Sequence, residues 1–156
     1  MSQLKQLTEL LIAQNLTITA AESCTGGALC SLLTDQSGAS VYFDRGFITY
    51  TNQAKMDMLG VMQATLEEFG AVSEQTAKQM AKGAISQAKT DISVAITGIA
   101  GPEGGSREKP VGMVCFGFCI FGQCFTTTQN FTGDRLQVVK ASIDFVLTTL
   151  IHELSS

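Results

Sequence analysis

The chain has 156 residues, a length that a single domain ordinarily covers. Hydrophobic residues make up 45% of it and charged residues 15%, a composition too apolar for a disordered chain. The net charge is −4, and the ten Lys and Arg residues form no cluster, which argues against nucleic acid as a partner.

The first part of the chain predicts a helix, a strand, a turn and a second helix. Leucines at helical spacing predict an amphipathic helix over residues 2–14. Residues 17–22 are rich in β-favouring side chains and end at the tight turn Ser23–Gly27. A helical segment over residues 28–33 follows directly.

The middle of the chain predicts one strand and three helices. Residues 45–50 favour a strand, and Asn52 is placed to cap the helix that follows. Thr65 and Glu68 have the spacing of a capping box, which predicts that a short helix starts there. Ser73 then opens a longer helix whose apolar stripe consists largely of alanine.

The last part of the chain predicts three strands and a helix around a glycine-rich loop. Residues 91–97 predict a strand that is buried on both faces. After the loop Gly98–Pro110, residues 111–120 and 123–129 predict a hairpin with a two-residue turn. Asp134 can cap the final helix.

This order of elements predicts the class of fold. Strands that alternate with helices indicate parallel crossovers, and the late hairpin adds antiparallel strands. No internal repeat or linker divides the sequence. We therefore predict a single three-layer α/β/α domain over residues 1–156, with a mixed, mostly parallel sheet and a C-terminal β-hairpin.

Histidine and cysteine limit the chemistry and the compartment. The only histidine, His152, ends a predicted helix, where it complements the helix dipole, so an enzyme of this sequence needs another base. Five cysteines form no CxxC pair, no signal peptide is recognisable, and no apolar stretch reaches the length of about 18 residues that a spanning helix needs. We expect reduced thiols in a cytoplasmic protein without membrane contact.

Hydroxyls, glycines and a lysine follow the three strands that are expected to be parallel. Ligands bind beyond the carboxyl ends of the strands in open α/β sheets. If these strands are parallel, the side chains that follow them meet at one edge of the sheet. The residues concerned are Ser23, Cys24, Thr25, Gly26, Gly27, Tyr50, Lys55, Thr97, Gly98 and Gly101.

Ser23 has the position of a nucleophile at a strand-to-helix turn. The N–H groups of Thr25, Gly26 and Gly27 would point toward the space beside its hydroxyl and could stabilise an oxyanion. Desolvation and the helix dipole would lower the pKa of Lys55, which could then act as the base. Taken singly, each feature is also typical of ordinary structure, since serine caps helices and lysine in a first turn is commonly solvated.

Tyr50, Arg135 and Cys24 each have two interpretations. Tyr50 could relay a proton or fix the lysine, or it packs in the strand with its hydroxyl in water. Arg135 is a candidate fork for phosphate or carboxylate, or a partner in a surface ion pair. Cys24 is a rival nucleophile or, without a histidine partner, a small buried side chain.

Several longer motifs occur in order across nearly the whole chain. They are Ala21-Glu22-Ser23-Cys24-Thr25-Gly26-Gly27, Gly46, Tyr50-Thr51-Asn52, Lys55, Val72-Ser73-Glu74, Thr97-Gly98-Ile99-Ala100-Gly101-Pro102, Lys109-Pro110-Val111-Gly112 and Gly133-Asp134-Arg135. Together they resemble the CinA C-terminal domain family, which includes nicotinamide-nucleotide amidohydrolases, also called NMN deamidases.

The resemblance implies hydrolysis of the carboxamide of nicotinamide mononucleotide to nicotinic acid mononucleotide and ammonia, in pyridine-nucleotide salvage, with no metal and no cofactor. It implies that Ser23 is the nucleophile, that Lys55 is its base and that Tyr50 lines the same site. It also implies a homodimer or a larger homo-oligomer. The expected substrate-binding residues are Cys24, Thr25, Gly26, Gly27, Thr97, Gly98, Gly101 and Arg135.

Two other functions stay open on the sequence. A catalytically silent nucleotide-binding or regulatory module would keep the pocket and release no ammonia. A hydrolase that depends on Cys24 would tolerate Ser23→Ala and would be sensitive to thiol alkylation.

Overall fold

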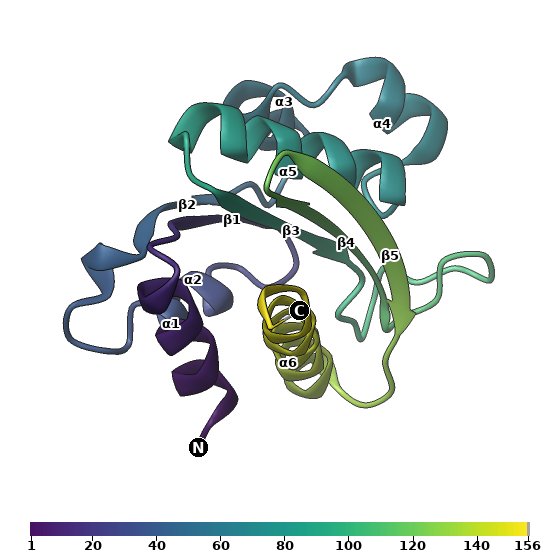
Figure 1. Ribbon diagram of the computed structural model, residues 1–156. Coiled ribbons are helices and arrows are strands. Elements are labelled where there is room, and N and C mark those ends of the chain that lie inside the picture. The colour runs from purple at the N-terminus through teal and green to yellow at the C-terminus, as the bar shows by residue number, and fades with distance from the viewer. Residues whose placement is uncertain (156) are drawn as a thin grey trace.

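A five-stranded mixed sheet in the order β2-β1-β3-β4-β5 forms the centre of the computed structural model, which describes residues 1–155 (Figure 1). β1 pairs in parallel with both β2 and β3, whereas β3–β4 and β4–β5 are antiparallel. The predicted mixed sheet with its C-terminal hairpin is thus confirmed, the parallel pairs being those of the first three strands. The strands are β1 (Ile18–Glu22), β2 (Phe43–Ile48), β3 (Ile92–Gly98), β4 (Met113–Ile120) and β5 (Gln123–Asn130).

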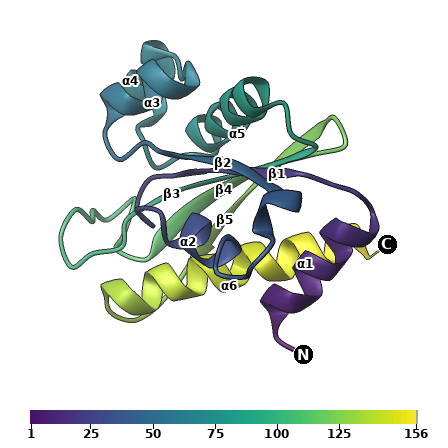
Figure 2. The same ribbon diagram turned by 90° about the vertical axis from the view of Figure 1, so that its left-hand side faces the viewer.

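Helices cover both faces of the sheet and give the predicted three layers (Figure 2). One face carries α3 (Asn52–Leu59), α4 (Gln63–Phe69) and α5 (Glu74–Ala88). The other face carries α1 (Gln3–Ala13), α2 (Ala28–Leu33) and α6 (Arg135–Leu154), with a short 3-10 turn at Ala39–Val41. Within residues 1–155, none of the helices combines the length and the apolar character needed to cross a membrane.

The two faces of the sheet carry side chains of different size. β3 sends Ile92, Val94 and Ile96 into a core that it shares with α1 and α6. On the opposite face, Gly117 of β4 lies against α5, and a Cβ atom at this glycine would stand 2.4 Å from the carbonyl oxygen of Ala77. The absence of a side chain at this position therefore lets α5 pack close to the sheet.

Two of the predicted helix starts are confirmed. The Ser73 hydroxyl caps α5 by accepting a hydrogen bond from the Thr76 N–H at 3.1 Å. At α6 the Asp134 carboxylate accepts from the Gln137 N–H at 2.9 Å, and the Gln137 side chain accepts from the Asp134 N–H at 2.8 Å. This reciprocal pair is a complete capping box.

Two other predicted starts are wrong. Thr51, not Asn52, caps α3, because its hydroxyl accepts from the Ala54 N–H at 3.1 Å. α4 begins at Gln63 without a side-chain cap, and Thr65 already lies inside it. The Thr65 hydroxyl accepts instead from the Gln79 amide at 2.7 Å, so a contact with α5 has replaced the local cap.

The hairpin between β4 and β5 corrects the expectation that all five cysteines are reduced. Its turn, Phe121-Gly122, has two positive φ angles, 51° and 79°, as this tight turn requires. Next to the closing pair of the turn, Cys119 and Cys124 face each other and form a disulfide, with their Cα atoms 4.1 Å apart. Directly opposed residues without backbone hydrogen bonds are the closest cross-strand pairs, which brings these thiols within bonding distance. The free cysteines are Cys24, Cys30 and Cys115.

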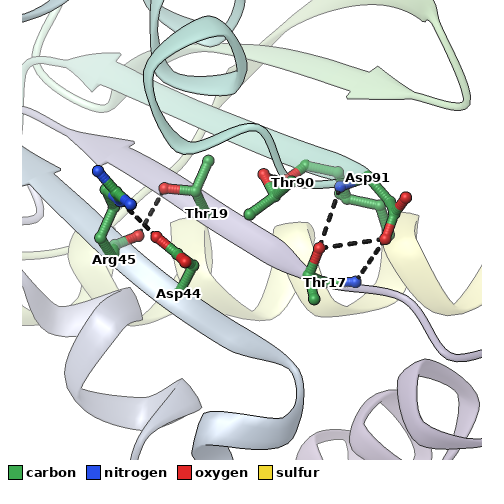
Figure 3. A network of polar contacts seen from close by, with 7 residues as sticks. Thr17, Thr19, Asp44, Arg45, Thr90 and Asp91 are labelled. Atoms are coloured by element: carbon green, nitrogen blue, oxygen red, sulfur yellow. Dashed lines mark hydrogen bonds and ion pairs between the residues drawn. The ribbon is translucent and has the colours of Figure 1, made fainter.

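Polar contacts fasten the amino ends of the parallel strands (Figure 3). The Asp91 carboxylate accepts hydrogen bonds from the N–H and the hydroxyl of Thr17, at 2.9 and 3.1 Å. The Thr19 hydroxyl donates to the carbonyl of Arg45 at 2.5 Å. These contacts join β1 to both of its neighbours at the end of the sheet that lies away from Ser23.

Candidate active site

The carboxyl ends of β1, β2 and β3 lie level with one another. The parallel register pairs Glu22 with Ile48 of β2 and with Ile96 of β3. Ser23, which follows β1, and Thr97, the last residue but one of β3, therefore lie at the same edge of the sheet. This is the meeting point that the sequence predicts.

Ser23 and Lys55 are in direct contact at this edge. The Lys55 Nζ donates hydrogen bonds to the Ser23 Oγ and to the Thr49 carbonyl, both at 2.9 Å. The Ser23 hydroxyl is oriented toward the Tyr50 carbonyl at 3.5 Å. α3 starts shortly after β2 ends, so Lys55, four residues into that helix, reaches back over the strand end.

Burial changes the acid–base behaviour of Lys55. Its side chain is 1% exposed, and within residues 1–155 no carboxylate forms an ion pair with it. Desolvation lowers its pKa from the usual value, and an electrostatic interaction with Cys24 opposes this only in part. The neutral amine, the form that can take a proton from a hydroxyl, is therefore easier to reach than in an exposed lysine.

Cys24 next to Ser23 is a poor nucleophile in this setting. Burial raises the pKa of its thiol to about 11, against smaller lowering effects that include the charges of Arg135 and Lys55. The thiolate is the reactive form, so at neutral pH this side chain is an unreactive thiol. The raised pKa of the Cys24 thiol therefore favours Ser23 over the cysteine alternative.

The turn after Ser23 differs from the predicted oxyanion hole. The Gly26 N–H donates to the Ser23 carbonyl at 3.1 Å, and the Gly27 N–H donates to the Glu22 carboxylate at 3.2 Å. Of the three N–H groups predicted as donors, only that of Thr25 has no partner among the described residues. Glu22 was not predicted to have a role, although a carboxylate in a fully buried strand needs hydrogen-bond partners and so indicates one.

A cavity of about 250 Å³ opens beside the Ser23 hydroxyl. The predicted site residues in its wall are Ser23, Cys24, Tyr50, Lys55, Thr97, Gly98, Gly101 and Arg135. Thr25, Gly26 and Gly27 are not among the residues that line it. Asn52 and Glu103, which the sequence analysis did not place in the site, also line the cavity. A larger groove, about 480 Å³ between α2 and α6, is lined by neither Ser23 nor Lys55.

Arg135 at the start of α6 connects two walls of the cavity. Its Nη1 donates to the Gly101 carbonyl at 2.8 Å, and its Nη2 donates to the Tyr50 hydroxyl at 2.9 Å. A guanidinium has five N–H donors, so others remain for an anion at the rim. Among the described residues no hydrogen bond joins Tyr50 to Lys55; the tyrosine hydroxyl pairs with Arg135 instead.

Thr97 uses its hydroxyl to hold the cavity wall. It donates to the Ala71 carbonyl at 2.9 Å and thereby fixes the segment before α5 against the end of β3. As for metal ions, no group of three or more His, Cys, Asp or Glu side chains in residues 1–155 is arranged to hold one.

The chain is similar to known proteins in both sequence and structure. The model of the CinA C-terminal domain matches residues 2–154. Nicotinamide-nucleotide amidohydrolase PncC of Escherichia coli (strain K12) is 47% identical over 154 residues, which cover 96% of this chain and 93% of the relative. The protein of the same name from Enterobacter agglomerans is 50% identical over 137 residues, 87% of this chain and 84% of the relative.

Solved structures agree with the fold. The crystal structure of a CinA superfamily protein from Klebsiella pneumoniae has a TM-score of 0.95 at 37% identity and covers 98% of this chain and 96% of its own. A CinA superfamily protein from Escherichia coli has a TM-score of 0.92 at 44% identity and covers 96% of this chain and 87% of its own.

Proposed function

The chain belongs to the CinA C-terminal domain family, and from this membership and the contact between Ser23 and Lys55 we propose that it is a nicotinamide-nucleotide amidohydrolase. The substrate is nicotinamide mononucleotide, and the products are nicotinic acid mononucleotide and ammonia. The names of the relatives indicate the class of reaction, and the buried hydroxyl–amine pair supports the chemistry.

Neutral Lys55 acts as the general base for Ser23. With one N–H of Nζ on the Thr49 carbonyl, the lone pair of the amine can accept the hydroxyl proton across the 2.9 Å contact. The Ser23 oxygen then attacks the carboxamide carbon, and the carbonyl oxygen becomes the oxyanion of a tetrahedral intermediate.

Collapse of the intermediate breaks the bond between carbon and nitrogen. Protonated Lys55 gives its proton to the leaving nitrogen, which departs as ammonia and leaves a nicotinoyl ester on Ser23. Water, deprotonated by the same lysine, hydrolyses that ester and returns the serine hydroxyl. The donors of Arg135 that remain free at the rim are available for the phosphate of the nucleotide.

The buried Ser23–Lys55 hydrogen bond carries this proposal, and removal of the hydroxyl tests it. We expect the purified protein to release ammonia from nicotinamide mononucleotide and Ser23→Ala to lower the rate by at least about 10³-fold. Ser31→Ala is the matched control, because it removes an exposed serine hydroxyl of α2 outside the cavity. Mass spectrometry during turnover should find the acyl adduct on the peptide that contains Ser23.

Two results would contradict the proposal. Undiminished turnover of Ser23→Ala, together with inactivation by thiol alkylation, would assign the reaction to Cys24. Thermal stabilisation by the nucleotide without any ammonia from the wild-type protein would identify a binding or regulatory module.

A further inference from the structure

A fully buried carboxylate stands directly before the nucleophile. Glu22 is 0% exposed and ends β1, and the chemistry described above makes no use of it. Its Oε1 accepts hydrogen bonds from the Thr25 hydroxyl at 2.6 Å, from the Gly27 N–H at 3.2 Å and from the Leu29 N–H at 3.0 Å. Its Oε2 accepts from the Cys30 N–H at 2.9 Å.

These bonds hold both ends of the turn that carries Ser23. Thr25 lies before the glycine pair of the turn, whereas Leu29 and Cys30 lie in the first turn of α2. The glycines between them have φ angles of 56° and 104°, a conformation that residues with a side chain rarely adopt. A single carboxylate therefore fixes how the chain turns from β1 into α2.

The turn leaves two backbone donors in the two residues that follow the nucleophile, and the first of them, Cys24, lines the cavity together with Ser23. Among the described residues, the N–H groups of Cys24 and Thr25 donate to no other residue, whereas those of Gly26 and Gly27 donate to the Ser23 carbonyl and to the Glu22 carboxylate. The contact between the Thr25 hydroxyl and Glu22 fixes one of these two residues directly. Backbone donors in this position relative to a serine nucleophile can stabilise an oxyanion.

We propose that Glu22 is a positioning residue that holds the N–H groups of Cys24 and Thr25 as the oxyanion-stabilising pair of the site. The inference rests on the proposed amide hydrolysis by Ser23. Glu22 does not line the cavity; it acts through the turn that it binds.

Glu22→Gln tests the proposal, because glutamine keeps the size of the side chain but presents an NH₂ group to at least one of these donors. We expect kcat to fall by about 10²-fold with KM nearly unchanged, since an oxyanion exists only after attack. Removal of the negative charge would by itself favour an oxyanion nearby. A fall in kcat in Glu22→Gln would therefore mean that the backbone donors have moved, and could not be explained by the loss of the negative charge of Glu22.

A second readout separates this role from a general structural one. An analogue of the nucleotide with an aldehyde in place of the carboxamide can form a hemiacetal on Ser23, whose oxygen would occupy the same donors. We expect its affinity to fall in parallel with kcat in Glu22→Gln, while affinity for the product stays the same. Rates are expressed per folded protein, with the folded fraction taken from thermal unfolding.

Glu74→Gln is the matched control. The Glu74 carboxylate also accepts from threonine hydroxyls, those of Thr126 and Thr128 at 2.7 and 2.6 Å, but it lies outside the cavity that Ser23 lines. We expect this variant to lose stability and to keep the kcat and the aldehyde affinity of the wild type.

If Glu22→Gln does not fold, Thr25→Val decides the question, because it removes only the hydroxyl that Glu22 binds. We expect a fall in kcat of about tenfold, again without a change in KM. A kcat per folded protein equal to that of the wild type would overturn the proposal, as would a rise in KM at constant kcat. A wild-type protein that releases no ammonia would instead overturn the proposed function.

Discussion

Lys55 is a buried amine with which no carboxylate of residues 1–155 forms an ion pair, and its burial has consequences for stability as well as for chemistry. Desolvation disfavours the ammonium form in the folded protein, whereas the unfolded chain exposes the amine to water. A group whose pKa is lowered by folding binds more protons in the unfolded state. The residue that we propose as the base is therefore also a source of pH-dependent instability.

Lys55→Met should remove that pH dependence. Below the folded-state pKa of Lys55, the folded and the unfolded protein both hold the proton, so the destabilisation by the buried ammonium group does not change with pH. Between that pKa and about 10.5, the unfolding free energy of the wild type should rise by as much as about 1.4 kcal/mol per pH unit relative to the variant. Urea denaturation at a series of pH values measures this difference. Parallel profiles for the two proteins would mean that the lysine titrates normally when folded.

Activity should follow the same titration. We expect kcat/KM of the wild type to increase with pH until Lys55 is deprotonated and then to level off, because only the neutral amine can accept the Ser23 proton. The Lys55→Met variant lacks the amine and should show no turnover at any of these pH values.

At the scale of elements, the approach of α5 to the sheet depends on small side chains. Ser93 of β3 donates its hydroxyl to the Ala81 carbonyl at 2.7 Å, and Gly117 of β4 faces Ala77 in the same helix. α5 in turn contacts α3, which carries Lys55. The small-residue face therefore brings α5, and with it the neighbouring α3 that carries Lys55, close to the sheet.

Gly117→Ala should disturb this packing. Its Cβ would stand 2.4 Å from the Ala77 carbonyl oxygen and 2.9 Å from the carbonyl carbon, both backbone atoms, so the helix or the strand has to move. We expect a loss of unfolding free energy of about 1–3 kcal/mol in chemical denaturation. Gln123→Ala, at an exposed position of β5, should change it by no more than about 0.5 kcal/mol. Equal unfolding free energies for the two variants would show that α5 does not pack tightly against Gly117.

At the scale of the whole molecule, the amino and carboxyl ends of the parallel strands have different roles. The carboxyl ends carry Ser23 and Thr97, whereas the amino ends are joined by the contact between Asp91 and Thr17 (Figure 3). A change at the amino ends should therefore affect stability and leave the chemistry intact.

Asp91→Ala should lower stability without affecting catalysis. It removes the acceptor for two Thr17 donors, and we expect a loss of about 1–3 kcal/mol in unfolding free energy. The kcat and KM for ammonia release should stay at the wild-type values. Asp44→Ala, at the same end, removes a contact with the adjacent Arg45 that does not join two strands; it is the control and should cost less than about 1 kcal/mol. A large fall in kcat for Asp91→Ala would mean that the two ends are coupled.

Much of the fold was predictable because it depends on near neighbours in the chain. The apolar run of β3, the caps Ser73 and Asp134, and the turn at Phe121-Gly122 are local signals, and each lies where it was predicted. Thr65 shows the limit of such signals, because its hydroxyl binds Gln79 of another helix and caps nothing.

The sequence by itself determined the order of the elements, the parallel start of the sheet and the set of residues that follow its strands. Only the tertiary structure decided that Lys55 is buried with no ion-pair partner in the part of the chain that is described, that Glu22 binds two of the predicted turn residues, and that Cys119 and Cys124 are joined. Backbone preference is a property of a few adjacent residues. Desolvation and the choice of partner depend on which distant segments meet, as Ser23 and Lys55 do across 32 positions.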